Sequence, residues 1–159
     1  MKIRLVVVGK LKEPFLKDMC NEYIKRLQAY ASVEVVEVND ELLQANSSLK
    51  DEENCRIKEG ERLLGKIKDN EYVYLLDLHG QQYDSVTFAK NMDRVMTSGK
   101  STLTFVIGGS TGLSDDVRKR SNEKICLSKM TFTHLMTRGI ILEQIYRAFT
   151  IINNKTYHK

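Results

Sequence analysis

Apolar and polar positions along the chain predict strands and helices in regular succession. Short apolar runs of strand character lie at residues 2–8, 33–38, 71–78, 103–107 and 124–127. Apolar residues recur at helical spacing over residues 14–30, 49–68 and 86–97, and again in the last third of the chain. A short helix is also expected over residues 115–121. Ser85 is a candidate N-cap for the third of these helices. This alternation predicts one α/β domain over residues 1–159, with a mainly parallel sheet flanked by helices.

The last helix is expected after the loop at residues 127–133, and its apolar face is wider than one core requires. A central core helix of a monomer is one interpretation, and a helix packed against its own domain and a second subunit is the favoured one. Its few polar residues, Arg138, Glu143 and Arg147, are expected to lie together, and Glu143 and Arg147 form an i,i+4 pair in the stabilising order. The apolar positions are Leu135, Met136, Ile140, Ile141, Leu142, Ile145, Tyr146, Phe149 and Ile152.

A glycine-rich segment, GGSTG, follows the strand expected at residues 103–107. Glycines at a strand's carboxyl end let a ligand approach the backbone, and open α/β sheets bind ligands at that edge. A tight turn without a ligand is the alternative. The segment is not a P-loop, because no Gly-Lys-Ser/Thr follows, and Gly9 stands alone where a dinucleotide fingerprint needs more glycines. If the last three strands are neighbours, loops 76–80, 108–112 and 127–133 converge on one pocket.

Composition narrows the class of protein without naming a function. The 159 residues, 42% hydrophobic and 29% charged, are ordinary for a globular domain. No segment resembles a signal peptide or a membrane span, so we expect a cytoplasmic protein with no membrane partner. Three widely spaced cysteines predict reduced thiols, and three scattered histidines match no metal motif, so no metal is expected.

The formal net charge of +4 permits a nucleic-acid partner. Basic residues cluster beside the glycine segment and at the chain terminus, as either a solvated face or a phosphate-contacting surface. They are Arg118, Lys119, Arg120, Lys124 and Lys129, followed by Lys155, His158 and Lys159.

Four motifs in order, VIGGSTGLS, LSKMTFTH, EQIYRA and a terminal Tyr-His-Lys, carry a resemblance over essentially the whole chain. The sequence resembles the ribosomal large-subunit pseudouridine N3-methyltransferases, small members of the SPOUT superfamily. The resemblance implies an α/β domain with a C-terminal deep trefoil knot, and a homodimer formed through the C-terminal helix. It implies S-adenosyl-L-methionine as cofactor and 23S ribosomal RNA, within assembled ribosomes or large particles, as substrate.

The resemblance also assigns residues by motif. Cofactor contacts fall on Leu76, Gly108, Leu127, Ser128, Lys129, Met130, Thr131 and Phe132. Catalytic roles fall on His134, Arg138, Tyr157 and His158, and RNA contacts on Lys129, Lys155 and Lys159. Thr133, Gly139 and Thr156 depart from the family pattern, at positions where proline, a larger apolar residue and proline are usual.

Methylation of N3 requires the imide proton to leave. His158, with Tyr157, is the candidate for proton removal or orientation, and a tail supplied to the neighbouring subunit would place both. Glu143 and Arg147 are expected to be structural partners, and His134 could simply bond backbone at a helix start. Two rivals remain open: a non-catalytic RNA-binding or ribosome-assembly factor that binds S-adenosylmethionine, and a methyltransferase of this fold acting on ribose or another base.

Overall fold

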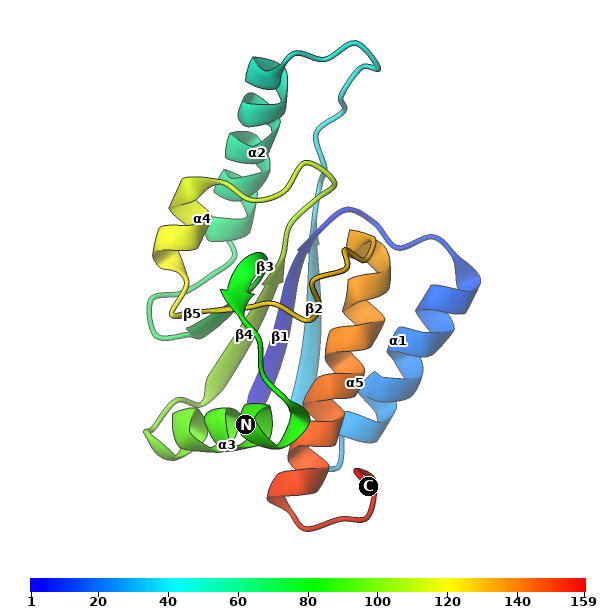
Figure 1. The fold of residues 1–159 in the computed structure, drawn as a ribbon, viewed down its shortest axis with the longest axis vertical. Helices are drawn as coiled ribbons and strands as arrows, with labels where there is room; N and C mark the ends of the chain where they lie inside the picture. Colours follow the sequence, from blue (N-terminus) through cyan, green and yellow to red (C-terminus); the bar gives the residue numbers. More distant parts are fainter.

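The centre of the protein is a five-stranded parallel sheet in the order β2-β1-β4-β3-β5 (Figure 1). The computed structural model describes all residues 1–159. Its strands are β1 Lys2–Val8, β2 Ser32–Val38, β3 Tyr72–Gln81, β4 Thr102–Ile107 and β5 Glu123–Ile125. The predicted α/β class is confirmed. Strands β4, β3 and β5 are neighbours, so their carboxyl ends lie at one edge of the sheet. The predicted convergence of residues 76–80, 108–112 and 127–133 on one pocket is not confirmed, because residues 76–80 belong to β3 and only the third segment lines the apolar pocket described below.

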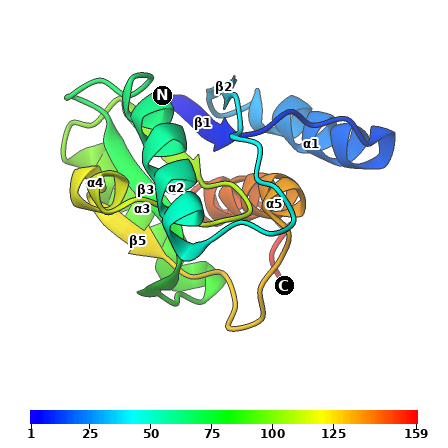
Figure 2. The same cartoon turned by 90° about the horizontal axis from the view of Figure 1, so that it is seen from above.

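Helices cover both faces of the sheet. They are α1 Pro14–Leu27, α2 Leu49–Leu64, α3 Ser85–Thr97, α4 Asp115–Arg120 and α5 His134–Ile152. Figures 1 and 2 show α1 beside α5, and α2 beside α4. No helix is long and apolar enough to cross a membrane.

Strand alternation divides the core into two clusters. In β1, Ile3, Leu5 and Val7 pack with α1, α3 and α5, while Val6 and Val8 pack with residues of α2 and α4. All five side chains are at most 1% exposed. Burial on both faces is why the strand reads as a nearly continuous apolar run in the sequence.

Several predicted boundaries need correction. Helices α1 and α2 end at Leu27 and Leu64, earlier than the expected residues 30 and 68. Asp84, not Ser85, caps α3, because its Oδ1 accepts the Thr87 N–H at 2.7 Å. β5 ends at Ile125 rather than at Leu127, which leaves Leu127 in the following loop. β3 continues through His79 and Gly80, where the sequence predicted a stop.

That continuation of β3 crosses the chain that leaves β5. A Cβ on Gly80 would lie 2.7 Å from the Ile125 nitrogen, so only glycine permits the approach. The Cys126 N–H then donates to the Gln81 carbonyl at 2.9 Å. The crossing directs the loop after β5 toward α5. The trefoil knot itself stays a prediction that the resemblance implies.

Helix α5 is buried on several sides, as its wide apolar pattern predicted. It packs against both α1 and α3. A Cβ on Gly139 would lie 2.6 Å from the Met19 Sδ, so the glycine lets α1 approach closely. This contact explains a residue that weakens the helix by about 1 kcal/mol in propensity. The three cysteines are buried and unpaired.

Candidate active site

An apolar pocket of about 200 Å³ lies where the loop after β5 meets α3 and α5. Two predicted cofactor residues, Leu127 and Phe132, are part of its wall. The other lining residues are Tyr83, Asp84, Phe88, Ile125, Cys126, Ile140, Ile141 and Gln144. The sequence did not assign Tyr83 and Phe88 to the pocket, because Tyr83 lies in the segment before α3 and Phe88 in α3, and only the packing of this helix brings them to the loop after β5. Gln144 lies in the EQIYRA motif, but the sequence did not assign it to the pocket.

The loop 127–133 offers main-chain donors beside this pocket. Within it, only the Met130 N–H donates inside the protein, to the Ser128 Oγ at 3.0 Å. Lys129, Met130, Thr131 and Phe132 are exposed, and Figure 2 shows the loop projecting from the body of the molecule. Free amide groups next to apolar walls suit a flat ligand with a polar edge.

Leu76 and Gly108 lie near this edge but do not line the pocket. Leu76 is half-buried and pairs with Ile125 across β3 and β5. A Cβ on Gly108 would lie 2.8 Å from Leu113 Cδ2, and the Gly112 N–H donates to the Gly109 carbonyl at 3.1 Å. The glycine segment therefore forms a tight turn, and the assignment of Gly108 to the cofactor stays a prediction.

An ion pair joins strand β3 to helix α4. Arg118 Nε donates to Asp77 Oδ2 at 3.1 Å, and Arg118 Nη1 donates to the Leu113 carbonyl at 3.0 Å. Asp77 Oδ1 accepts the His79 N–H at 3.1 Å. Asp77 is 8% exposed, so the carboxylate depends on these partners. Arg118 thus braces the edge of the sheet instead of lying free for a phosphate.

His134 and Arg138 lie at the carboxyl end of β1. Arg138 is 2% exposed and donates to Glu37 Oε2 and to the Gly9 carbonyl, each at 2.6 Å. His134 lies against Gly9, and burial followed by the Arg138 charge lowers its pKa. These contacts give Arg138 a structural task that ties α5 to β1 and β2. Its predicted grouping with Glu143 and Arg147 is wrong, because it faces the sheet.

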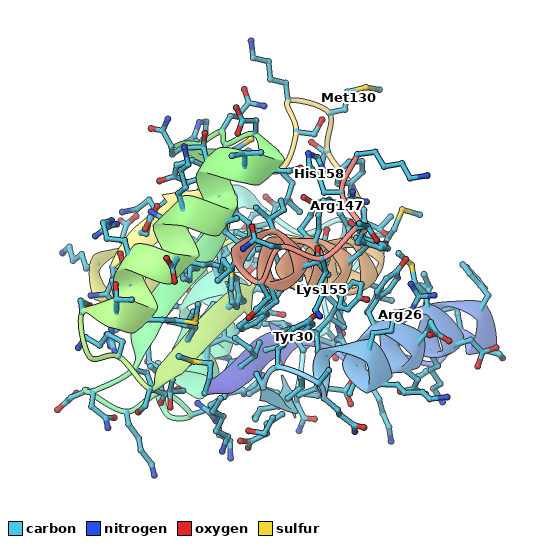
Figure 3. The ribbon with its side chains drawn as sticks, turned by 90° about the horizontal axis from the view of Figure 1, so that it is seen from below. Arg26, Tyr30, Met130, Arg147, Lys155 and His158 are labelled. Atoms are coloured by element: carbon cyan, nitrogen blue, oxygen red, sulfur yellow. The ribbon has the colours of Figure 1, made fainter.

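The terminal residues form a second group at the other end of α5. Tyr157 donates to Glu143 Oε1 at 3.1 Å, and Arg147 Nη2 donates to the same oxygen at 2.5 Å. Figure 3 shows the C-terminal segment folded back so that His158 lies beside Arg147. Burial and hydrogen bonding raise the pKa of Tyr157, so its phenol remains protonated at neutral pH. The expected Glu143–Arg147 pair is confirmed.

The four assigned catalytic residues are therefore divided between two places. Arg138 and Arg147 are nine residues apart on one helix, which corresponds to about 13 Å along its axis. Figure 1 shows the C-terminus at the far end of α5 from the loop 127–133. Within one subunit, the terminal group does not reach the start of the helix.

Lys129, Lys155 and Lys159 are exposed, as RNA-contacting residues must be. Lys129 lies in the loop after β5, and the other two follow α5. Arg120 of the predicted basic cluster instead donates to the Lys68 and Glu71 carbonyls. A larger groove, of about 610 Å³, lies between α2 and α4 but contains none of the assigned residues.

The structure also contains a buried carboxyl that the sequence did not single out. Glu59 on α2 is 4% exposed, and a Cβ on Gly109 would lie 2.7 Å from its Oε1. Oε2 accepts the Glu41 N–H at 3.0 Å, whereas Oε1 has no hydrogen-bond partner. Desolvation by burial raises the pKa of Glu59.

A parallel sheet with an apolar, donor-lined pocket at its carboxyl edge defines an α/β protein that binds a small ligand. The family model described as predicted SPOUT methyltransferase matches residues 1–158, and the chain belongs to this family.

The chain is also similar, over its full length, to curated relatives. It is 51% identical to the ribosomal RNA large subunit methyltransferase H of Enterococcus faecalis, over 161 residues and all of both chains. It is 50% identical to the protein of that name from Clostridium acetobutylicum, again over all of both chains. A solved Legionella pneumophila methyltransferase, in complex with the bound cofactor SAM, shares the fold at a TM-score of 0.50 and 12% identity. That match covers 94% of this chain and 66% of the Legionella chain.

Proposed function

We propose that this protein transfers a methyl group from S-adenosyl-L-methionine to N3 of a pseudouridine in 23S ribosomal RNA, within assembled ribosomes or large particles. The observation that carries the proposal is the end-to-end match, at about half identity, to relatives named as large-subunit ribosomal RNA methyltransferases. The motifs and their order supply the position of the methyl group.

The residues present fit the cofactor. The apolar walls formed by Leu127, Phe132 and Ile140 suit an adenine ring, and the free amides of the loop 127–133 suit its polar edge. S-adenosylmethionine supplies a methyl on a cationic sulfur: the N3 lone pair forms the new N–C bond while the C–S electron pair stays on sulfur. The chain's own task is then to position the base and stabilise its charge.

A homodimer built on α5 supports the same function. The pocket of about 200 Å³ is smaller than the roughly 300 Å³ at which ligand sites usually begin, which favours a site that a second subunit completes. Two α5 helices packed antiparallel would bring the terminal residues of one subunit to the loop 127–133 of the other. Tyr157 and His158 would then complete the partner's site, with Lys129, Lys155 and Lys159 beside the RNA.

Mapping the methylated nucleotide in cells tests the substrate. In a strain lacking the gene, mass spectrometry of 23S ribosomal RNA should show one pseudouridine that has lost a base methyl group. Restoring the gene should return the modification. Loss of a ribose methyl, or of a methyl on another base, would instead support a different reaction of this fold. An unchanged 23S RNA would support the binding-factor alternative.

A further inference from the structure

We propose that His158 acts as a hydrogen-bond donor through its Nε2–H, not as the base that removes the N3 proton, and that Arg147 imposes this role. This inference rests on the proposed function. It assigns His158 to stabilising charge on the substrate, and it makes Arg147 a positioning residue that selects the tautomer of His158.

The contact between the two side chains determines the tautomer. Arg147 Nη1 lies 3.2 Å from His158 Nδ1. A guanidinium carries only donors and does not lose its proton in proteins, so the ring nitrogen that faces it must offer a lone pair. A neutral imidazole whose Nδ1 accepts carries its hydrogen on Nε2. The one nitrogen left to face a substrate is therefore a donor.

Arg147 is itself held in this orientation from several sides. Its Nη2 donates to Glu143 Oε1 at 2.5 Å, and its guanidinium lies 4.7 Å from the centre of the Tyr157 ring. The second Glu143 oxygen accepts Gln144 Nε2 at 2.7 Å, and Gln144 lines the apolar pocket. The Arg147 side chain is 26% exposed and that of Glu143 is 15% exposed. The terminal tail is thus connected to the pocket wall through a continuous set of hydrogen bonds.

A donor suits the chemistry of the imide. When N3 loses its proton, the negative charge is shared between N3 and the two carbonyl oxygens beside it. In this account solvent hydroxide takes the proton and becomes water, and the electron pair stays on N3. A donor aimed at one of the carbonyl oxygens stabilises that anion, which is the task of an oxyanion-hole group.

Activity of His158 variants separates the donor from the base. His158→Gln keeps an N–H donor but cannot take up a proton, and His158→Ala has neither. We expect His158→Gln to retain kcat within about tenfold of the parent, and His158→Ala to lose about 100-fold or more, as for loss of one oxyanion-hole donor. Equal loss in both variants would overturn the proposal. Calorimetric binding of S-adenosylmethionine checks that each variant is folded.

The tautomer can be read without any methyl transfer, by ¹⁵N NMR of protein labelled at histidine. The His158 signals, assigned by their loss in His158→Gln, should show a pyridine-type Nδ1 and a pyrrole-type Nε2 in the neutral ring. Arg147→Lys should preserve this pattern, and Arg147→Met should mix the two tautomers. Arg26→Met is the matched control, because Arg26 lies over Tyr23 and Tyr146 and donates to Glu22, whereas the hydrogen-bond partner of His158 is Arg147.

A pyrrole-type Nδ1 in the unmodified protein would refute the inference, whatever the activity. If no RNA is methylated but the NMR pattern holds, the proposed function fails while the tautomer assignment stands. The two failures are therefore distinguishable.

Discussion

The side chain of Glu59 on helix α2 packs against the glycine turn after β4. Its carboxyl group is buried, and one of the two oxygens has no hydrogen-bond partner. The unfolded chain would leave that group in water, whereas the native protein holds it against Gly109. A buried acceptor without a partner costs about 1–3 kcal/mol. The buried Glu59 carboxyl therefore destabilises the native protein, next to the glycine turn after β4.

Replacing Glu59 by glutamine should stabilise the protein, and more so as pH rises. Burial raises the pKa of Glu59, so the native state keeps a proton that the unfolded chain has lost, and stability falls as pH rises through that window. Glu59→Gln removes this loss, and we expect a gain of about 1 kcal/mol at neutral pH. Urea unfolding at pH 5 and pH 8 measures it. A variant that is less stable at pH 8 would show that the carboxylate makes a favourable contact.

The sequence predicted the positions of some site residues but not the contacts of others. The motifs placed Leu127 and Phe132 in the pocket wall, because they lie within one short loop. Arg138 could not be placed in the same way, because its partner Glu37 is 101 residues away in sequence. An arginine that the sequence shows without a nearby carboxylate can still be paired in the structure, when a strand end from a distant part of the sequence packs against its helix.

At the scale of elements, the Asp77–Arg118 pair ties helix α4 to strand β3, and Arg118 also holds the loop after β4 through the Leu113 carbonyl. Arg118→Met should lower affinity for S-adenosylmethionine about tenfold, because the carboxyl edge of the sheet loses this brace and Asp77 is left buried and unpaired. Titration calorimetry measures the affinity. Lys119→Met, on the same helix, is the matched control and should bind like the parent. Unchanged binding by the Arg118 variant would show that the brace does not position the pocket.

Elements were easier to predict than their ends. Apolar patterns indicated the strands and the longer helices, since each must bury a face against a neighbour. The short helix α4 contains only one apolar residue, Val117, and shows no such pattern. The cap of α3 was misplaced by one residue because Asp84 and Ser85 can both cap a helix, and only the backbone entering α3 decides between them. The extension of β3 was missed because Gly80 serves as a crossing point where a turn was expected.

At the scale of the whole molecule, the central question is whether two subunits build one site. Mixing two inactive variants answers it. One lacks Tyr157, His158 and Lys159, and the other carries Phe132→Ala in the cofactor loop. If the tail acts across the dimer, mixed dimers should regain methyl transfer, because one of their two sites then has both intact parts. No recovery, with mixed dimers demonstrated by affinity tags, would place the tail in its own subunit.

The most direct test of the account is methyl transfer from labelled S-adenosylmethionine to ribosomes from cells lacking this protein. One set of ribosomes would contain the pseudouridines of 23S RNA, and the other would come from cells that do not form them. We expect label in 23S RNA only when pseudouridine is present. Equal labelling of both sets would contradict the assigned base, and no labelling of either, despite measurable cofactor binding, would contradict the enzyme.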